Sequence, residues 1–188
     1  MTAGVFSVVY NDIVKNFNCT FYSNIGSFSG GAMQVVGFHR DKCVKKNTMV
    51  WNFNCKFILN RAIEGGAIYA QHIHTLNNIN CKFVKNYADL KFYGQGGGIY
   101  LVNYCNNFNY RTIFQDNYAH HYGAGIYNSY GSKTYNLASL FIQNHCGYGG
   151  GGVCQTMVKT LYNKNSKFLG NVAKTSGGAL AVGDSTIS

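Results

Sequence analysis

The chain has 188 residues, of which 46% are apolar and 15% aromatic, so a disordered chain is excluded and one domain can bury a continuous core. Charged residues make up only 12%, proline is absent and glycine occurs 23 times, which favours stacked strands and tight corners over helices. The net charge of +10 favours acidic partners, although an Asn- and Lys-rich composition with singly scattered lysines accounts for it equally well.

No segment resembles a targeting signal or a membrane span. No apolar run approaches the roughly 18 residues that a membrane-spanning helix needs. The segment from Met1 to Asp12 lacks a basic stretch followed by a long apolar one, so no signal peptide is expected. Because the chain ends inside a repeated unit, at Gly183 to Ser188, we expect residues 1–188 to be a fragment of a longer chain.

Two short motifs alternate along the whole chain. Phe-x-x-Asn occurs at Phe21/Asn24, Phe57/Asn60, Phe83/Asn86, Phe114/Asn117, Phe141/Asn144 and Phe168/Asn171. A glycine-rich step ending in an aliphatic residue follows each copy and begins at Gly30, Gly65, Gly96, Gly123, Gly150 and Gly177. The last four steps follow one another at intervals of 27 residues. A period of this length indicates a repeat architecture.

Other positions repeat in step with each Phe. Five residues before it stand Asn16, Asn52, Asn78, Asn109, Asn136 and Asn163. Four residues before it stand Phe17, Phe53, Ile79, Tyr110, Leu137 and Lys164, and two before it Cys19, Cys55, Cys81, Thr112, Ser139 and Ser166. The alternation indicates strands with one buried face. Short strands in a repeat of about 27 residues without helices predict a parallel β-helix.

In such a solenoid identical residues stack from coil to coil. We expect the Phe column to fill the interior and inward Asn side chains to hydrogen-bond to one another and to the backbone. A left-handed hexapeptide helix lacks the required six-residue period, and a leucine-rich repeat lacks its Leu pattern. Two coils are longer than the rest, which predicts an insertion loop at residues 37–49 and a smaller insertion at 87–95.

The paired tetrapeptides resemble the repeats of the chlamydial-type polymorphic outer-membrane protein family. Phe57 to Ile68 (FILNRAIEGGAI) and Phe168 to Leu180 (FLGNVAKTSGGAL) match best, and the resemblance covers essentially the whole chain. It implies a right-handed, pectin-lyase-like β-helix that is exported to the cell surface and acts in adhesion. The chain departs from the family pattern in its basic charge and in having Gly98, Gly125 and Gly152 where the repeat has Ala.

Two groups of residues are candidate ligand contacts. Arg40, Lys42, Lys45 and Lys46 lie in the longer insertion and can grip an anionic glycan or form only a solvated loop. Tyr69, Tyr100 and Tyr127 follow the aliphatic residue of three successive coils and should form an outward aromatic stack. Such a stack can serve as a platform for sugars or a partner protein, although aromatic ladders also stabilise stacked strands without any ligand.

No residue set predicts catalysis. Enzymes of this fold class that act on acidic polysaccharides need clustered acids, either as Ca²⁺ ligands or as paired carboxylates. The six acids are Asp12, Asp41, Glu64, Asp89, Asp116 and Asp184, and no two of them share a column in adjacent coils. His72 and His74 suit a pair of zinc ligands, but no third ligand aligns with them and surface histidines are the favoured interpretation.

Seven cysteines are an odd number. Cys19, Cys55 and Cys81 stand in one inward column whose other members are Thr and Ser, so stacking of small residues explains them without disulfides. A bridge between Cys146 and Cys154 is one alternative that the spacing leaves open.

The sequence therefore predicts one all-β domain over residues 1–188, a right-handed, single-stranded parallel β-helix (solenoid) of about six to seven coils of roughly 27 residues. We expect a non-enzymatic, extracellular adhesin or structural solenoid at a cell surface, with an anionic glycan or a surface protein as partner and with end-to-end self-association. Nucleic acid is not expected as a partner, and no cofactor or metal is expected. The alternative is a pectin-lyase-like lyase or hydrolase of acidic polysaccharide.

Overall fold

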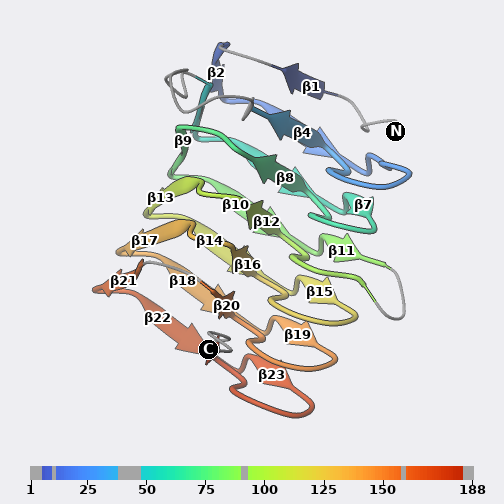
Figure 1. Cartoon of the computed structure of the whole chain (residues 1–188), viewed down its shortest axis with the longest axis vertical. Helices are drawn as coiled ribbons and strands as arrows, with labels where there is room; N and C mark the ends of the chain where they lie inside the picture. Colours follow the sequence, from blue (N-terminus) through green and yellow to red (C-terminus); the bar gives the residue numbers. More distant parts are fainter. Residues whose placement is uncertain (1–5, 10–11, 38–47, 90–92, 158–159, 184–188) are drawn as a thin grey trace.

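The structure is a computed structural model that describes residues 6–9, 12–37, 48–89, 93–157 and 160–183. The chain forms a parallel β-solenoid of about six coils, as predicted, and the described residues contain no helix. In Figure 1 the coils lie one below another in sequence order, from the blue N-terminal coil to the red C-terminal coil. Each strand pairs in parallel with its counterparts in the neighbouring coils, so four sheets run along the solenoid.

The strands of the first two sheets are the longest. The first sheet contains β1 (Phe6–Val9), β4 (Met33–Val36), β8 (Ile68–Gln71), β12 (Ile99–Val102), β16 (Ile126–Ser129), β20 (Val153–Thr156) and β24 (Leu180–Gly183). The second sheet contains β2 (Ile13–Phe17), β5 (Met49–Phe53), β9 (Thr75–Ile79), β13 (Asn106–Tyr110), β17 (Lys133–Leu137) and β21 (Thr160–Lys164).

The other two sheets are narrower. The third sheet contains β3 (Thr20–Tyr22), β6 (Lys56–Ile58), β10 (Lys82–Val84), β14 (Ile113–Gln115), β18 (Leu140–Ile142) and β22 (Lys167–Leu169). The fourth sheet contains β7 (Arg61–Ala62), β11 (Tyr87–Ala88), β15 (Tyr118–Ala119), β19 (His145–Cys146) and β23 (Val172–Ala173). Strands of two or three residues do not by themselves fix the register between coils. The columns of stacked residues described next fix this register.

The Phe column of the third sheet fills the interior, as predicted. Phe57, Phe83, Phe114 and Phe141 are completely buried. Along the whole column, from Phe21 to Phe168, neighbouring ring centroids are 4.6–4.8 Å apart and the ring planes lie within 8° of parallel. This spacing is that of strands in a sheet, so each ring packs directly on the ring of the next coil.

Two asparagine ladders run beside the Phe column and confirm the predicted inward Asn. In the second sheet, each Asn from Asn16 to Asn136 donates a side-chain hydrogen bond of 2.8–2.9 Å to the Asn of the next coil. The Asn of the Phe-x-x-Asn motif forms a second ladder from Asn24 to Asn171, with hydrogen bonds of 2.8–2.9 Å. Both ladders satisfy amide groups that would be costly to bury alone.

The second ladder also holds the backbone. The side-chain oxygen of Asn117 accepts a hydrogen bond from the backbone N–H of Asn86, and its amide donates to the carbonyl oxygen of Phe83 at 2.9 Å. Asn60, Asn86 and Asn144 repeat this arrangement in their own coils. An amide of this length at the corner is therefore needed in every coil, which explains why the motif ends in Asn.

The first glycine of each glycine-rich step has a backbone reason. Gly30, Gly65, Gly96, Gly123, Gly150 and Gly177 all have φ between 56° and 68°. This left-handed conformation strains residues that carry a Cβ, so the repeated position favours glycine. At each of them a Cβ would also collide with the carbonyl oxygen three residues later.

No disulfide joins the cysteines of the described residues. Cys55 and Cys81 are completely buried in the inward column with Thr112 and Ser139, as predicted. The possible bridge between Cys146 and Cys154 is not formed. Burial raises the pKa of the Cys146 thiol to about 11 and that of Cys154 to about 12.

The predicted insertions lie partly outside the described residues. Residues 38–47 are not described, and Met49 already belongs to β5. Residues 90–92 are not described either, while Tyr87 and Ala88 form β11 and Gln95 forms bridges to Glu64 and Tyr122. Residues at both ends of the predicted insertion 87–95 therefore belong to the regular coil. In the part of the chain that the structure describes, no helix is long and apolar enough to span a membrane.

Candidate functional site

The two predicted groups of ligand contacts have different outcomes. Arg40, Lys42, Lys45 and Lys46 lie outside the described residues. The predicted tyrosines pair in register on β8, β12 and β16: Tyr69 with Tyr100, and Tyr100 with Tyr127. Their ring centroids are 5.4 and 5.1 Å apart at interplanar angles of 78° and 35°.

The tyrosine column lies outside the main core, as expected, but two of its rings are covered by neighbouring side chains. Tyr100 and Tyr127 are only 7% and 6% exposed, and both pack with Val102 and Cys154 in a small apolar cluster outside the main core. The Tyr127 hydroxyl lies 2.8 Å from Thr156 Oγ1, and burial raises the pKa of Tyr127 to about 12. Sequence spacing gives the direction of a side chain but not what covers it, and here neighbouring side chains cover these rings.

The pair of histidines considered for zinc is also arranged differently. β8 ends at Gln71, and His72 has a φ of 53°, so His72 and His74 do not lie on one strand. Ile73 between them is completely buried in the core. Among the described residues, no three His, Cys, Asp or Glu side chains gather as metal ligands would.

A surface depression lies beside the fourth sheet. It has a volume of about 690 Å³. Its lining residues are Asp89, Tyr118, His120, Gly147, Tyr148, Lys174 and Thr175, which come from four successive coils. We call this depression the lateral groove.

Strand alternation directs the groove residues outward. Ala88 and Ala119 are the buried residues of β11 and β15, and they pair with each other in register. The residues on either side of a buried strand residue point to the opposite face. Tyr87 and Tyr118 therefore lie outward before these alanines, and their rings stack at 4.6 Å and 8°. Asp89 and His120 follow the alanines and lie beside the two rings.

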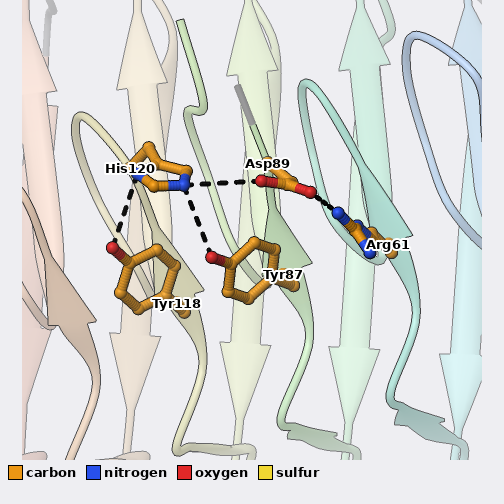
Figure 2. A network of polar contacts seen from close by, with 5 residues as sticks. All are labelled: Arg61, Tyr87, Asp89, Tyr118 and His120. Carbon is orange, nitrogen blue, oxygen red and sulfur yellow. Dashed lines mark hydrogen bonds and ion pairs between the residues drawn. The ribbon is translucent and has the colours of Figure 1, made fainter. Parts of the chain in front are cut away.

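His120 is the centre of a polar network in this groove (Figure 2). Its Nε2 atom lies 3.4 Å from Asp89 Oδ1 and 3.4 Å from the Tyr87 hydroxyl, and its Nδ1 atom lies 3.5 Å from the Tyr118 hydroxyl. The imidazole stands perpendicular to both tyrosine rings, at 86° and 89°. Three neighbouring side chains from two coils thus hold one imidazole.

Arg61 completes the network on β7. Its guanidinium forms an ion pair with Asp89 and lies 5.6 Å from the centre of the Tyr87 ring. The guanidinium therefore offsets the negative charge of Asp89 on the side away from His120 (Figure 2). Because Arg61 is more than half exposed, this pair contributes little to stability.

The outward column of groove residues has a gap at Gly147, which has no side chain. In register, Gly147 follows Cys146 where His120 follows Ala119, and Lys174 follows Ala173 in the next coil. The outward column therefore runs Asp89, His120, Gly147, Lys174. A Cβ on Gly147 would collide with the carbonyl oxygen of His120, so this position favours glycine. The result is a notch of two coil spacings, roughly 10 Å, between His120 and Lys174.

The walls of the notch are aromatic and polar. Thr175 Oγ1 donates to the carbonyl oxygen of Tyr148 at 2.9 Å, and the His121 ring packs against Tyr148 at 4.3 Å. Burial, and then the neighbouring Tyr87, raises the pKa of Tyr118, so its phenol stays protonated and can donate at neutral pH. Lys174 brings a positive charge to one end. This arrangement suits a carboxylate or sulfate group attached to an apolar ring.

Sequence reasoning missed this set of residues. Asp89, His120, Gly147 and Lys174 each stand three residues after the Asn of their Phe-x-x-Asn motif. Aligning that column would have brought them together, whereas the positions of acids alone gave no cluster.

Comparison with known proteins adds no relative: no family model, curated protein or solved structure matches the chain. The repeat architecture and the asparagine ladders therefore rest on the repeats of the sequence and on the structure.

Proposed function

We propose that the protein is a non-enzymatic adhesin at a cell surface and that its lateral groove binds an anionic glycan. The observation that carries the proposal is the lateral groove, in which no side chain stands at Gly147 between His120 and Lys174. The net charge of +10 supports an acidic ligand by attracting it from a distance.

The aromatic walls support a sugar rather than a small inorganic anion. Tyr118 and Tyr148 offer ring surface and hydroxyl groups, which together suit the apolar faces and the hydroxyls of a pyranose. The resemblance of the repeats to polymorphic outer-membrane proteins is the reason for placing the protein outside the cell. Further contacts to the same glycan are proposed for Arg40, Lys42, Lys45 and Lys46.

Titration with polygalacturonate tests the proposal. We expect Lys174→Gln and His120→Gln each to weaken binding by about tenfold, the usual effect of losing one charged or hydrogen-bonding contact. Lys167→Gln is the matched control, because it removes the same charge from β22 on the third sheet. Equal losses in the Lys167 and Lys174 variants would show that binding depends on net charge and not on the groove.

One observation favours a second candidate, a polysaccharide lyase. The chain of contacts from Asp89 through His120 to the Tyr118 hydroxyl is suited to acid–base chemistry. In that reaction His120 would remove the proton next to the carboxylate of a uronate. The glycosidic C–O bond would then break, the leaving oxygen would take up a proton, and an unsaturated sugar would remain. Incubation with polygalacturonate followed by ultraviolet absorbance detects this product, and its release would contradict the adhesin proposal.

A further inference from the structure

The outward face of the second sheet is unusually apolar for a surface exposed to water. Its inward residues are the Asn ladder and residues such as Val50 and Leu76, which are completely buried. The alternate positions of β2, β5, β9, β13, β17 and β21 therefore face outward, three from each strand. We call this surface the aromatic face. It includes Phe17, Trp51, Phe53, Phe108, Tyr110 and Tyr162.

These side chains form ordered stacks on the surface. Phe17 and Phe53 stack at 4.9 Å and 4°, and the Trp51 ring lies 5.8 Å from Phe53 at 8°. Farther along, Phe108 and Tyr135 stack at 4.7 Å and 6°. Hydrocarbon is exposed as well, since Ile13 is 62% and Phe17 58% accessible.

The face is about as large as the largest apolar patch on a typical soluble monomer, and such patches are often functional. Six strands at about 4.8 Å and five residues at about 3.3 Å cover on the order of 400 Å². Exposed apolar patches of a few hundred Å² are at the upper end for soluble monomers and are often functional. Burial within the solenoid does not explain the apolar residues here, because the core lies on the opposite side of the same strands.

Charge identifies the kind of partner. The outward residues of these six strands include Lys15, Lys133 and Lys164 and contain no acid. The guanidinium of Arg111, just after β13, lies 5.0 Å from the Tyr110 ring. The acid that lies nearest in sequence to any of these six strands is Asp12, directly before β2. A second copy of the chain would bring lysines against lysines, so an anionic partner is favoured.

Polarity then selects among anionic partners. A depression of about 350 Å³ on this face is lined by Ile13, Lys15, Phe17, Met49, Trp51 and Phe53. Apart from the indole of Trp51, Lys15 has the one side chain in this lining that can donate a hydrogen bond to an acidic group. A glycan needs many partners for its hydroxyls, and this lining does not offer them. Aromatic rings, aliphatic side chains and scattered lysines are the combination that lies in the interface of an anionic bilayer.

We propose that the aromatic face docks the solenoid on an anionic lipid surface, with the aromatic and aliphatic side chains among the headgroups and the lysines paired with lipid phosphates or carboxylates. In Figure 1 the strands β13, β17 and β21 lie at the left edge of the coils, and β11, β15, β19 and β23 of the groove lie at the right. Docking through the aromatic face therefore leaves the lateral groove free.

The single tryptophan gives a direct test, because Trp51 lies in this face. The whole chain is titrated with vesicles of phosphatidylcholine containing about 30% phosphatidylserine, and with vesicles of phosphatidylcholine alone. We expect a blue shift of Trp51 emission and quenching by brominated lipid with the anionic vesicles, and at least tenfold weaker partitioning into the neutral ones.

Matched variants distinguish binding through the aromatic face from nonspecific hydrophobic adsorption to the vesicles. Phe17→Ser combined with Phe108→Ser should lower partitioning into anionic vesicles at least tenfold, whereas Leu169→Ser removes from β22 an apolar side chain whose exposure lies between those of Phe17 and Phe108 and should leave partitioning unchanged. Thermal melts confirm that the variants fold. Lys174→Gln and His120→Gln, which test the groove, should bind vesicles like the unmodified chain, so the two proposals fail independently.

Three results would overturn the proposal. The first is unchanged Trp51 emission with anionic vesicles. The second is a shift that polygalacturonate produces and vesicles do not, which would assign the face to a glycan. The third is a shift that depends on protein concentration without lipid and coincides with a dimer in sedimentation, which would assign the face to a second copy.

Discussion

Asn109 donates its side-chain amide to the side-chain oxygen of Asn136 at 2.8 Å, and both side chains are buried within the solenoid. Asn109 also accepts a hydrogen bond from Asn78 at 2.9 Å. One amide therefore connects three coils. A ladder of this kind makes each interior member depend on two neighbours, so the energetic cost of a substitution should depend on its place in the column.

Asn109→Ala should lower the free energy of unfolding by roughly 2–4 kcal/mol, because it removes two hydrogen bonds and leaves an amide of Asn78 and an oxygen of Asn136 without their partner. Asn163→Ala, in the last described coil of the same ladder, breaks one such bond from Asn136 and should cost only about 1 kcal/mol. Urea titrations of both variants measure the difference. Equal losses would contradict the ladder.

Phe114→Ala should cost about 3–5 kcal/mol, the usual range for a fully buried phenylalanine. The Phe114 ring packs between Phe83 and Phe141 at 4.8 Å on both sides, so the cavity cannot close without moving two coils. The same urea titration applies. Phe17→Ala is the control on the outward side of the second sheet, where 58% exposure leaves little to lose, and its cost should stay below about 1 kcal/mol.

Glycine substitutions should separate backbone strain from collision. Gly123 and Gly170 both have a φ of 60°, but a Cβ on Gly123 would collide with the carbonyl oxygen of Ile126, whereas one on Gly170 would meet only the Gln143 side chain at 3.4 Å. Gly170→Ala should therefore cost about 1 kcal/mol from strain alone, and Gly123→Ala about 3 kcal/mol or more. Thermal melts compare them, and similar melting temperatures would show that the coil shifts to relieve the contact.

The buried tyrosines should make the fold sensitive to alkaline pH. Burial raises the pKa of Tyr127 to about 12, against about 10 in an unfolded chain, and raises the pKa values of Tyr69 and Tyr100 as well. Because the folded state holds these protons more tightly, the stabilisation is complete below about pH 10 and is lost as the pH rises toward 12.

Melting temperatures between about pH 8 and pH 11.5 measure this loss. Tyr127→Phe should cost about 1 kcal/mol near neutral pH through the lost contact with Thr156, and should flatten the decline above pH 10. Tyr130→Phe removes the hydroxyl of a half-exposed tyrosine and serves as the control. A decline of unchanged steepness in the Tyr127 variant would mean that other groups cause the alkaline unfolding.

Prediction from the sequence succeeds where a residue serves the repeat itself. Phe57 and Asn60 occupy positions that every coil needs, because each stacks on its copies at the strand spacing. Their recurrence therefore gave the solenoid, the inward columns and the strand register without a structure. It also placed Tyr69, Tyr100 and Tyr127 in one column, which the strand pairing confirms.

The candidate sites depend on residues that differ between coils, and for these the repeat gives no rule. Asp89 pairs with Arg61 and His120 from neighbouring coils. The lateral groove depends on Gly147, which has no side chain and lies between His120 and Lys174 in the same column. The exposure of an outward residue depends on what lies over it. Tyr100 is covered and Phe17 is open, although both alternate with core residues.

The sequence by itself thus determined the coil, its period and the residues of its interior, since stacking requires the same side chain at the same place in every turn. Only the tertiary structure decided which outward residues meet across coils and which remain open to solvent. Those contacts depend on the local shape of several coils at once, through a missing side chain at Gly147 and uncovered rings at Phe17 and Trp51.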